Sequence, residues 1–399
     1  MSKLRVLDGM DSYLPHVDGV INCMHNYCKY GCKKADVTAV APRYRHYKDD
    51  QPYEIIRCRS VYFPVLAVQY GRATEDKKFY KKVMQKNYDI VHVHSPFNMA
   101  KFALKVAKKQ NIPATATFHT NMRPIFRQAV KSKFLAERLV KILGKTYNRF
   151  DEVFVCSPLV EEQCRSFGYT GKISYLPYGT DFPRCENKEE LRRQANERFG
   201  FKDDELVLIY VGRIEKLKKI DLILESLKIL KDRGLKFRFF AIGKGSDMNK
   251  MAKLKKKLGF TDEEVTFMGF IARELFPLMY ARGDLFVFPS LYDNFGLVKV
   301  EAAAFATAGV FTEGSCAGYG VTHGVNGYLA KDDKNDFAEV ILSAVSDRAA
   351  LKKAGENALR DLYVSWQECT DMYLERLEKI VEERKERLSA ENPYAADNT

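Results

Sequence analysis

Short apolar runs separated by amphipathic stretches recur along the whole chain. In the first half these runs predict strands at 4–9, 36–42, 89–95, 114–120, 152–157 and 173–179. In the second half they predict strands at 206–212, 237–243, 265–270 and 284–290, with weaker candidates at 309–314 and 327–332. Runs this short and apolar are typical of parallel strands buried on both faces, with helices between them. The pattern therefore predicts an α/β fold with two doubly wound, Rossmann-like parallel sheets.

The predicted join between the two sheets lies within 178–190, where Gly, Pro and charged residues replace the periodic pattern. We expect an N-terminal domain at 1–180 and a C-terminal domain at 181–360, which face each other across a ligand cleft at the carboxyl ends of their strands. A long C-terminal helix is predicted at 361–390, and the polar tail 391–399 is expected to be disordered. A chain of 399 residues exceeds what one hydrophobic core usually supports, which agrees with two domains.

Composition narrows the class of partner. The formal net charge of +13 indicates an anionic partner, which could be nucleic acid, anionic lipid or a phosphorylated substrate. The nine cysteines are odd in number and form no paired C-x-x-C pattern, so we expect a reducing cytoplasm rather than a disulfide framework or zinc ribbon. One cluster has metal-ligating residue types, but its spacing fits a helix packed on a core equally well: Cys23, His25, Cys28 and Cys32.

The clearest candidate site follows the apolar run 285–288. Asp293 comes shortly after this run, and a helical pattern that begins near Gly296 or Leu297 carries Glu301. In a doubly wound fold such a helix start lies at a ligand site, and its free backbone N–H groups attract anions such as phosphate. Both carboxylates could then face a ligand that spans the helix start. The spacing is equally compatible with a capping acid and a solvated helical Glu.

A second turn carries chemistry suited to phosphate. Gly212 and Arg213 directly follow a predicted strand, and Lys218 comes shortly after them. Arg offers a fork of donors and Lys a point charge, so together they could neutralise a diphosphate. The glycine turn at 243–248 disfavours NAD or FAD, because Met248 takes the place of the third Gly in a dinucleotide fingerprint.

A series of short motifs occurs in order over nearly the whole chain. They are "PHVDGV" around Gly19, "DIVHVH", "TFHTN" around His119, "PYGTD" at the join, "YVGRIEKLKK", "FAIGKGS", the stretch 284–303 and "GVNGYL" at 324–329. Together they resemble the retaining nucleotide-sugar glycosyltransferases of the GT-B fold, in the family-4 group. The segment 312–329 is similar to bacterial diacylglycerol glucosyltransferases, which are glycolipid synthases.

The resemblance implies a role for each matched residue. The family's pair of spaced carboxylates falls on Asp293 and Glu301, and Glu301 would accept hydrogen bonds from the ribose hydroxyls. Asp293 would hold the sugar and phosphate together with the backbone N–H groups of Asn294, Phe295, Gly296 and Leu297.

Other matched residues would approach the donor from elsewhere. Arg213 and Lys218, beside Gly212, would clamp the diphosphate, and Gly19 would approach the phosphates from the other domain. His119 would reach the transferred sugar or the acceptor. Without the resemblance, a His at a strand end is more often a packed core residue.

Some residues keep a structural interpretation or depart from the family. We interpret His92 and His94 as packed on one face of their strand. Asp293 replaces the usual Glu, and Tyr319 stands where relatives usually carry an acid. These two changes put the sugar preference in doubt and leave room for reduced activity.

The family's chemistry implies transfer of a hexose, glucose from UDP-glucose or a similar donor, with retained anomeric configuration. In this front-face displacement the leaving diphosphate helps to take the acceptor proton, so no protein nucleophile is required. The chain has no D-x-D triplet, the usual acidic site for a nucleotide-sugar metal, so we expect neither a metal nor a cofactor besides the nucleotide-sugar co-substrate.

Two basic stretches, 77–86 and 131–149, point to the acceptor. Both mix basic and apolar residues, as amphipathic faces on anionic membranes do, although solvated helices would have the same pattern. The predicted membrane contacts are Lys77, Lys78, Lys81, Lys82, Lys131, Lys133 and Lys141, with Phe134, Leu135, Leu139 and Leu143 inserted. No apolar run reaches the roughly 18 residues of a spanning helix. We therefore expect a protein held peripherally on the inner face of the cell membrane, with a diacylglycerol-type lipid acceptor.

Two alternatives remain open. The chain could be a soluble transferase acting on a polysaccharide or small molecule, or a weakly active sugar-nucleotide or membrane-binding module. Nucleic-acid binding fits poorly, because the sequence has no recognised motif and no evident aromatic stacking platform.

Overall fold

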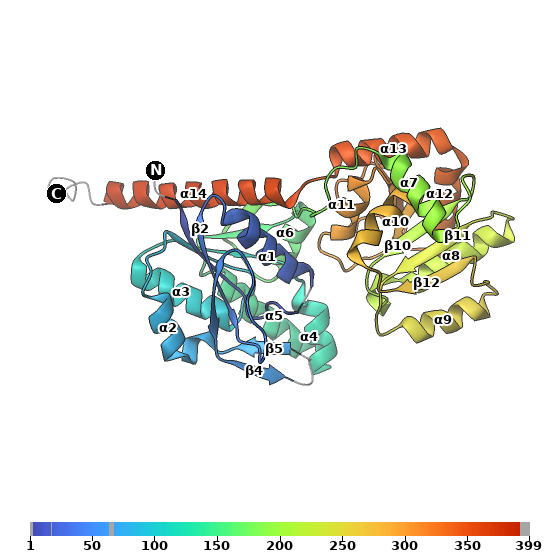
Figure 1. Cartoon of the computed structure of the whole chain (residues 1–399). Coiled ribbons are helices and arrows are strands. Elements are labelled where there is room, and N and C mark those ends of the chain that lie inside the picture. Colours follow the sequence, from blue (N-terminus) through green and yellow to red (C-terminus); the bar gives the residue numbers. More distant parts are fainter. Residues whose placement is uncertain (1–2, 17, 64–67, 392–399) are drawn as a thin grey trace. The chain divides into compact units, whose positions relative to one another are not determined.

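The computed structural model describes residues 3–16, 18–63 and 68–391. The chain folds into two compact units, of which unit 1 contains the residues up to Tyr178 and those from Trp366 onward. Unit 2 contains Gly179–Ser365. The division falls between Tyr178 and Gly179, beside the predicted boundary at 180. The chain therefore crosses between the units twice (Figure 1).

Unit 1 is built on a seven-stranded parallel sheet in the order β3-β2-β1-β6-β7-β8-β9. Its strands are β1 (Arg5–Gly9), β2 (Asp36–Pro42), β3 (Glu54–Cys58), β6 (Ile90–Val93), β7 (Ala114–Thr117), β8 (Glu152–Val155) and β9 (Lys172–Tyr175). An antiparallel hairpin pairs β4 (Ser60–Phe63) with β5 (Val68–Gly71). The sequence did not predict β3, β4 or β5. Strand β3 lies at the sheet edge, and its polar residues Glu54 and Arg57 interrupt the apolar pattern.

Seven α-helices of unit 1 lie in its described residues. They are α1 (Gly19–Gly31), α2 (Lys77–Val83), α3 (Asn98–Gln110), α4 (Met122–Val130), α5 (Lys133–Tyr147), α6 (Pro158–Ser166) and α14 (Trp366–Glu391), with a 3-10 turn η1 at Ala73–Glu75. The long helix α14 is therefore observed from Trp366, and the predicted start at 361 falls on the end of another helix. Apart from Glu391, the tail predicted to be disordered lies outside the described residues.

Helix α14 packs on unit 1 through a stripe of buried residues spaced three or four apart. Its Tyr373 ring stacks on Tyr27 of α1, with centroids 4.3 Å apart. Its Arg376 guanidinium forms two hydrogen bonds of 2.8 and 2.6 Å with the buried carboxylate of Glu152. Aromatic packing and this ion pair make the helix a part of unit 1.

Unit 2 is built on a six-stranded parallel sheet in the order β12-β11-β10-β13-β14-β15. Its strands are β10 (Val207–Val211), β11 (Arg238–Ile242), β12 (Val265–Gly269), β13 (Leu285–Phe288), β14 (Gly309–Thr312) and β15 (Tyr328–Ala330). Its helices are α7 (Lys188–Phe199), α8 (Ile220–Asp232), α9 (Met248–Lys257), α10 (Phe276–Arg282), α11 (Leu297–Ala304), α12 (Lys334–Ser346) and α13 (Arg348–Asp361), with 3-10 turns η2 (Lys216–Lys218) and η3 (Arg273–Leu275). Strands β10 and β13 are buried along their whole length at the centre of the sheet.

The predicted fold class is confirmed, because each unit is a parallel sheet covered by helices. Every strand run predicted from the sequence overlaps an observed strand, including the two weaker candidates, which are β14 and β15. Within the described ranges, no helix combines the length and the apolar character needed to cross a membrane.

Candidate functional site

Three turns at the carboxyl edge of the unit 2 sheet are tied together by backbone hydrogen bonds. The N–H of Gly212 donates to the carbonyl of Ile242 at 3.0 Å, and the N–H of Gly243 donates to the carbonyl of Gly269 at 2.8 Å. Gly212 and Gly243 follow β10 and β11, and Ile242 and Gly269 end β11 and β12; the three strands are neighbours in the sheet. The turns therefore form one backbone platform at the edge where α/β proteins bind ligands.

Glycine is required in this platform because the backbones pass so close together. A Cβ atom added to Gly243, whose φ is +140°, would lie 2.0 Å from the Gly212 carbonyl oxygen. Gly212 itself has φ +151°. The glycines that suggested a phosphate-binding turn therefore also have a structural cause in the packing of one turn on the next.

Lys218 and Asp293 meet at the centre of the same edge. Lys218 lies at the end of η2, and Asp293 lies in the turn after β13. The Lys218 Nζ is 2.5 and 2.7 Å from the two carboxylate oxygens of Asp293. Both side chains are largely buried, with 14% and 22% exposed. The structure thus brings together two predicted site residues that are 75 positions apart.

Arg213 points elsewhere. Its side chain is 71% exposed, and its guanidinium pairs with Glu215 at 3.1 Å. Its backbone carbonyl accepts a hydrogen bond of 2.8 Å from the Tyr210 hydroxyl. Burial and the nearby carboxylate of Asp293 raise the pKa of Tyr210, so this hydroxyl keeps its proton and holds the turn. Arg213 would have to leave Glu215 to reach a diphosphate.

Helix α11 begins in the way the sequence predicted. Gly296 precedes it with φ +72°, and a Cβ atom there would lie 3.2 Å from the Cβ of Ala317. Among the described side chains none caps this helix, and its first turn has no acid. Asn294, Phe295 and Leu297 are half-buried around this start. Uncapped N–H groups at a helix start favour an anion there.

Glu301 lies further along α11, and its Oε2 accepts a hydrogen bond of 2.7 Å from the Tyr280 hydroxyl. Burial raises the pKa of Glu301, and nearby Arg273 opposes that shift. Arg273 also pairs with Asp181 at 3.3 Å. The sequence did not single out Tyr280, Arg273 or Asp181. Arg273 could have been found, because it is a basic residue that comes soon after the strand β12.

His119 lies in the core of unit 1 and is 8% exposed. Its Nε2 is 2.7 Å from His94 Nδ1, and its Nδ1 is 2.7 Å from the Tyr178 hydroxyl. Burial lowers the pKa of His119 well below its usual value, so the ring is neutral. Both of its nitrogens already have protein partners. The nearby His92 is likewise packed, between Thr115 and Thr117 at 2.8 and 2.9 Å.

Gly19 is the first residue of α1, where the carboxylate of Asp18 accepts hydrogen bonds of 2.8 Å from the N–H groups of Val20 and Ile21. The acid Asp18 therefore lies at the start of α1, the helix start that we expected to approach the phosphates. The relation of Gly19 to a donor stays a prediction.

A metal site fits the side chains around His119 less well than hydrogen bonding does. Cys23, His94 and His119 have potential ligand atoms within 4.8 Å of one another. However, His94 Nδ1 and His119 Nε2 are only 2.7 Å apart. Two nitrogens bound tetrahedrally to zinc at about 2.0–2.1 Å would be about 3.3 Å apart. Burial also raises the pKa of the Cys23 thiol well above its usual value, which opposes the thiolate form.

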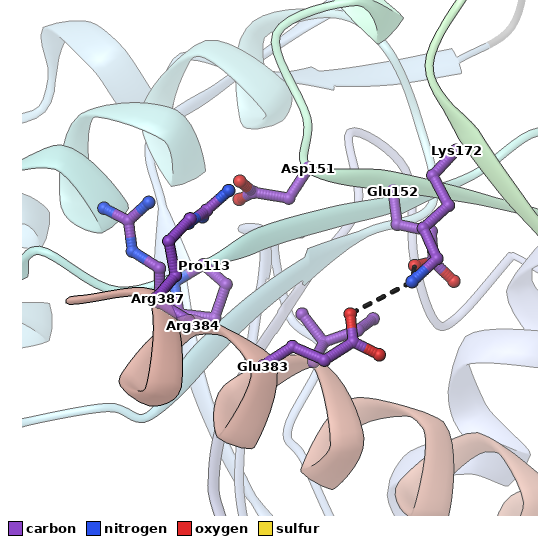
Figure 2. Close-up of a pocket in the computed structure, with 8 residues that line it drawn as sticks. Pro113, Asp151, Glu152, Lys172, Glu383, Arg384 and Arg387 are labelled. Atoms are coloured by element: carbon purple, nitrogen blue, oxygen red, sulfur yellow. Dashed lines mark hydrogen bonds and ion pairs between the residues drawn. The ribbon is translucent and has the colours of Figure 1, made fainter. Parts of the chain in front are cut away.

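The pocket shown in Figure 2 lies elsewhere, between α14 and the strand starts of β7, β8 and β9. Its lining residues are Pro113, Asp151, Glu152, Lys172, Ile380, Glu383, Arg384 and Arg387. Lys172 and Glu383 pair across it at 3.0 Å. None of the predicted site residues lines it. It lies at the opposite sheet edge from His119, which follows the carboxyl end of β7.

The basic residues predicted to contact a membrane are exposed on unit 1. On α2, Lys77, Lys78, Lys81 and Lys82 face outward while Phe79 and Val83 are buried, and none of these four lysines pairs with a described acid. Lys131, Lys133 and Lys141 are exposed on and around α5.

The apolar part of that prediction was partly wrong. Phe134 and Leu135 are exposed, at 73% and 45%, but Leu143 is buried in the core and Leu139 is half-buried. The face of α5 that packs on unit 1 contains Ala136, Val140, Leu143 and Tyr147. Ile142, directly before Leu143, is exposed, although the sequence pattern did not single it out.

Comparisons with known proteins match both halves of the chain. The model of Glycosyltransferase Family 4 matches residues 17–184, and the model of Glycosyl transferases group 1 matches residues 192–361. The chain is 27% identical over 308 residues to an alpha-monoglucosyldiacylglycerol synthase of Acholeplasma laidlawii, covering 74% of this chain and 76% of the relative. It is 26% identical over 306 residues to the protein of the same name from Streptococcus pneumoniae, covering 74% and 68%.

Among solved structures, Anabaena Alr3699/HepE in complex with UDP has a TM-score of 0.75 to this chain at 17% identity, covering 94% of this chain and 100% of the other. At this identity the likeness concerns the fold alone. The same Anabaena protein is also known in complex with UDP-glucose.

Proposed function

Because the chain belongs to the GT-B glycosyltransferases, with a family-4 half and a group 1 half, we propose that it transfers a hexose from a nucleotide sugar to a membrane lipid. The enzyme is a hexosyltransferase. The proposed donor is UDP-glucose or a close relative of it, and the proposed acceptor is a diacylglycerol-type lipid. The names of the two relatives and the nucleotides in the Anabaena structures support this choice.

The observation that carries the donor site is the Lys218–Asp293 pair beside the uncapped start of α11. A diphosphate at that helix start would meet backbone N–H groups and the Lys218 ammonium together. Asp293 would then be released to accept from a sugar hydroxyl. Glu301, oriented by Tyr280, would accept from the ribose hydroxyls.

The proposed chemistry places negative charge on the leaving diphosphate. In a retaining front-face displacement the acceptor oxygen bonds to the anomeric carbon as the donor's C–O bond breaks, and the leaving diphosphate oxygen helps to take the acceptor proton. Lys218 and the start of α11 would stabilise that charge, which develops most strongly in the transition state. Arg213 would add a second cation after leaving Glu215. No side chain needs to act as a nucleophile, and the proposal includes no metal.

The proposed acceptor side is the basic surface of unit 1. The four α2 lysines lie on a purely basic face, whereas the surface around α5 combines exposed lysines with Phe134, Leu135 and Ile142. Such surfaces suit anionic headgroups and shallow insertion at a bilayer. We therefore propose a cytoplasmic enzyme that associates peripherally with the inner face of the cell membrane.

Transfer from labelled UDP-glucose to diacylglycerol in anionic vesicles tests this function. We expect a chloroform-soluble labelled product, and faster transfer from UDP-glucose than from GDP- or ADP-glucose. Transfer only to water-soluble acceptors would refute the lipid acceptor. A thermal-shift panel identifies the base, since a ligand at 100 times its dissociation constant adds about 2.7 kcal/mol of stability.

A further inference from the structure

Four polar side chains form a continuous chain through the core of unit 1. Asp8 Oδ1 is 3.1 Å from His94 Nε2, and His94 Nδ1 is 2.7 Å from His119 Nε2. His119 Nδ1 is in turn 2.7 Å from the Tyr178 hydroxyl. Asp8 lies within β1, and His94 and His119 come shortly after the neighbouring strands β6 and β7. Parallel pairing puts Asp8 level with His92 and Thr115, so Asp8, His94 and His119 lie along a diagonal at the carboxyl ends of these strands.

The proton on His119 determines the direction of this chain. The ring is neutral and has one N–H, and burial raises the pKa of Tyr178 so that it keeps its hydroxyl proton. With the ring proton on Nε2, His119 donates to His94 Nδ1 and accepts from the Tyr178 hydroxyl. His94 Nε2–H then points toward Asp8, and each contact has one proton with no charge on either ring.

The opposite direction is less favourable. It requires a proton on His94 Nδ1, so a neutral His94 would turn a bare Nε2 toward the Asp8 carboxylate, and two acceptors would face each other. A cationic His94 would supply both protons and pair with the Asp8 carboxylate at 3.1 Å, so the position of the His119 proton decides between the two directions.

The contact between Asp8 and His94 is close but not aligned as a hydrogen bond. Asp8 Oδ1 and His94 Nε2 have no other hydrogen-bond partner among the described residues. Because an unpaired buried polar atom is unfavourable, a small ring rotation that aligns the two groups is favoured. Asp8 Oδ2 is also 3.3 Å from the Tyr373 hydroxyl of α14, which holds the carboxylate in place.

We propose that Asp8 and His94 are positioning residues that keep the ring proton of His119 on Nε2, so that Nδ1 accepts a hydrogen bond from a hydroxyl group. In the structure that hydroxyl belongs to Tyr178, and during transfer a hydroxyl of the sugar replaces it with the same donor sense. The exchange of hydroxyls rests on the proposed function, whereas the position of the ring proton does not.

The place of Tyr178 gives this exchange a mechanical consequence. Tyr178 is the last residue of unit 1 before the chain crosses to unit 2. Its ring stacks on Trp366, the first residue after the return crossing, with centroids 6.2 Å apart. When a sugar hydroxyl hydrogen-bonds to His119 Nδ1, the Tyr178 side chain therefore loses this bond, at the point where both crossings enter unit 1.

The ring proton can be located without any substrate. The chain has seven histidines, so nitrogen–proton NMR correlations of isotope-labelled histidine are few, and a His119→Gln variant assigns the signal of interest. We expect a neutral His119 with the proton on Nε2 at neutral pH. A proton on Nδ1, or a charged ring, would overturn the inference.

Two variants of β6 test whether His94 sets that proton. In His94→Leu we expect His119 to populate the Nδ1–H form, because its Nε2 has lost its acceptor. His92→Leu is the matched control, since His92 is equally buried but bonds to Thr115 and Thr117, and it should leave the Nε2–H form in place. An unchanged His119 proton in folded His94→Leu would refute the positioning role.

Activity then tests the sugar contact. His94→Leu should lower transfer about tenfold while affinity for UDP, which lacks the transferred hexose that would contact His119, stays unchanged. Tyr178→Phe should keep the Nε2–H form and at least wild-type transfer, because it removes the competing hydroxyl. Loss of transfer in Tyr178→Phe would contradict the exchange. If wild type transfers no sugar at all, the proposed function fails while the NMR result stands.

Discussion

Lys218 Nζ lies 2.5 Å from one oxygen of Asp293 and 2.7 Å from the other, in a partly buried setting. The two residues belong to turns that follow β10 and β13, which are adjacent strands at the centre of the unit 2 sheet. Lys218 and Asp293 hold each other's charge in place, so removing either side chain leaves the other charge poorly paired. The cation proposed to bind diphosphate is thus already fixed in place.

Lys218→Ala should lower kcat/KM by about 10- to 100-fold, because a hydrogen bond to a charged group contributes about 1.5–3 kcal/mol. The measurement is steady-state transfer at several donor concentrations. Lys216→Ala, an exposed lysine in the same turn, should have little effect. Equal losses in both variants would mean that the general charge of the turn, and not the position of Lys218, is important.

Asp293→Glu should lower the turnover rate. The added methylene would push the carboxylate into Lys218, which the shorter side chain already contacts with both oxygens. The test compares turnover at saturating donor, with Asp293→Asn as a variant of the same size without the charge. A faster Asp293→Glu enzyme would show that Asp293 is a defect relative to the family pattern.

Glu301→Gln should weaken UDP binding about tenfold, measured by calorimetry on the folded variant. Tyr280→Phe should weaken it less, since it removes only the hydroxyl that orients Glu301. Unchanged UDP affinity in Glu301→Gln would remove Glu301 from the donor site.

The raised pKa of Glu301 also gives a sign to the pH dependence. Ribose hydroxyls need an ionised acceptor, so UDP affinity should fall as the pH is lowered through a value above the ordinary 4.5. For stability the sign is opposite, because the folded state binds the proton more tightly than the unfolded state. The contribution of Glu301 to stability should therefore decline as the pH rises through that window.

Lys188 should make unit 2 more stable at alkaline pH. Burial lowers its pKa to about 8, from an ordinary 10.5. Between these values the unfolded chain binds the proton and the folded protein does not, so the free energy of unfolding should rise with pH across that window. The neutral amine can still donate to the Ala306 carbonyl and Thr307 hydroxyl, at 2.8 and 3.1 Å. Urea unfolding at pH 7.5 to 10.5 (about three pH units) measures the rise, and Lys188→Met should abolish it.

Membrane binding should depend on the basic face of α2. Changing its four lysines, Lys77, Lys78, Lys81 and Lys82, to Glu should abolish most sedimentation with anionic vesicles, since each contributes about 1 kcal/mol near such a surface. Wild-type binding should weaken as salt shortens the Debye length from about 10 Å at 0.1 M to about 3 Å at 1 M. The vesicle binding that persists at high salt should decrease in a double variant with Phe134→Ser and Ile142→Ser, because both apolar side chains are exposed.

The matched control for this experiment carries the same charge change on α9 of unit 2, at Lys250, Lys253, Lys256 and Lys257. It should retain vesicle binding. Equal loss in both variants would mean that net charge alone governs binding, and equal binding to neutral and anionic vesicles would contradict the electrostatic part of the proposal.

The fold was predictable because both central strands of unit 2 are buried on both faces, which leaves a continuous apolar run in the sequence. The edge strand β3 was not, since its polar residues Glu54 and Arg57 are tolerated where one side meets solvent. On α5 the pattern identified an amphipathic helix but not its rotation, so Leu143 was placed outside and Ile142 was overlooked.

The candidate site was predictable as a set of residues but not as a set of contacts. Adjacent strands imply that the turns with Lys218 and Asp293 are neighbours, yet only the fold shows that their charges are paired. For His119 the deciding partner is Tyr178, which is 59 positions away and has no local signal. The partners of a buried ring depend on tertiary packing, which no periodicity encodes.

The return of α14 to unit 1 has a consequence for biosynthesis. Residues 366–391 leave the ribosome only after all of unit 2, yet they supply Tyr373 and Arg376 to the interior of unit 1. The nascent chain therefore holds an unfinished first unit, with the side chains of Tyr27 and Glu152 still uncovered, while the second unit can complete its own sheet. Domains made from one uninterrupted segment fold in the order of synthesis. Here the second unit to be made is the first that can be finished.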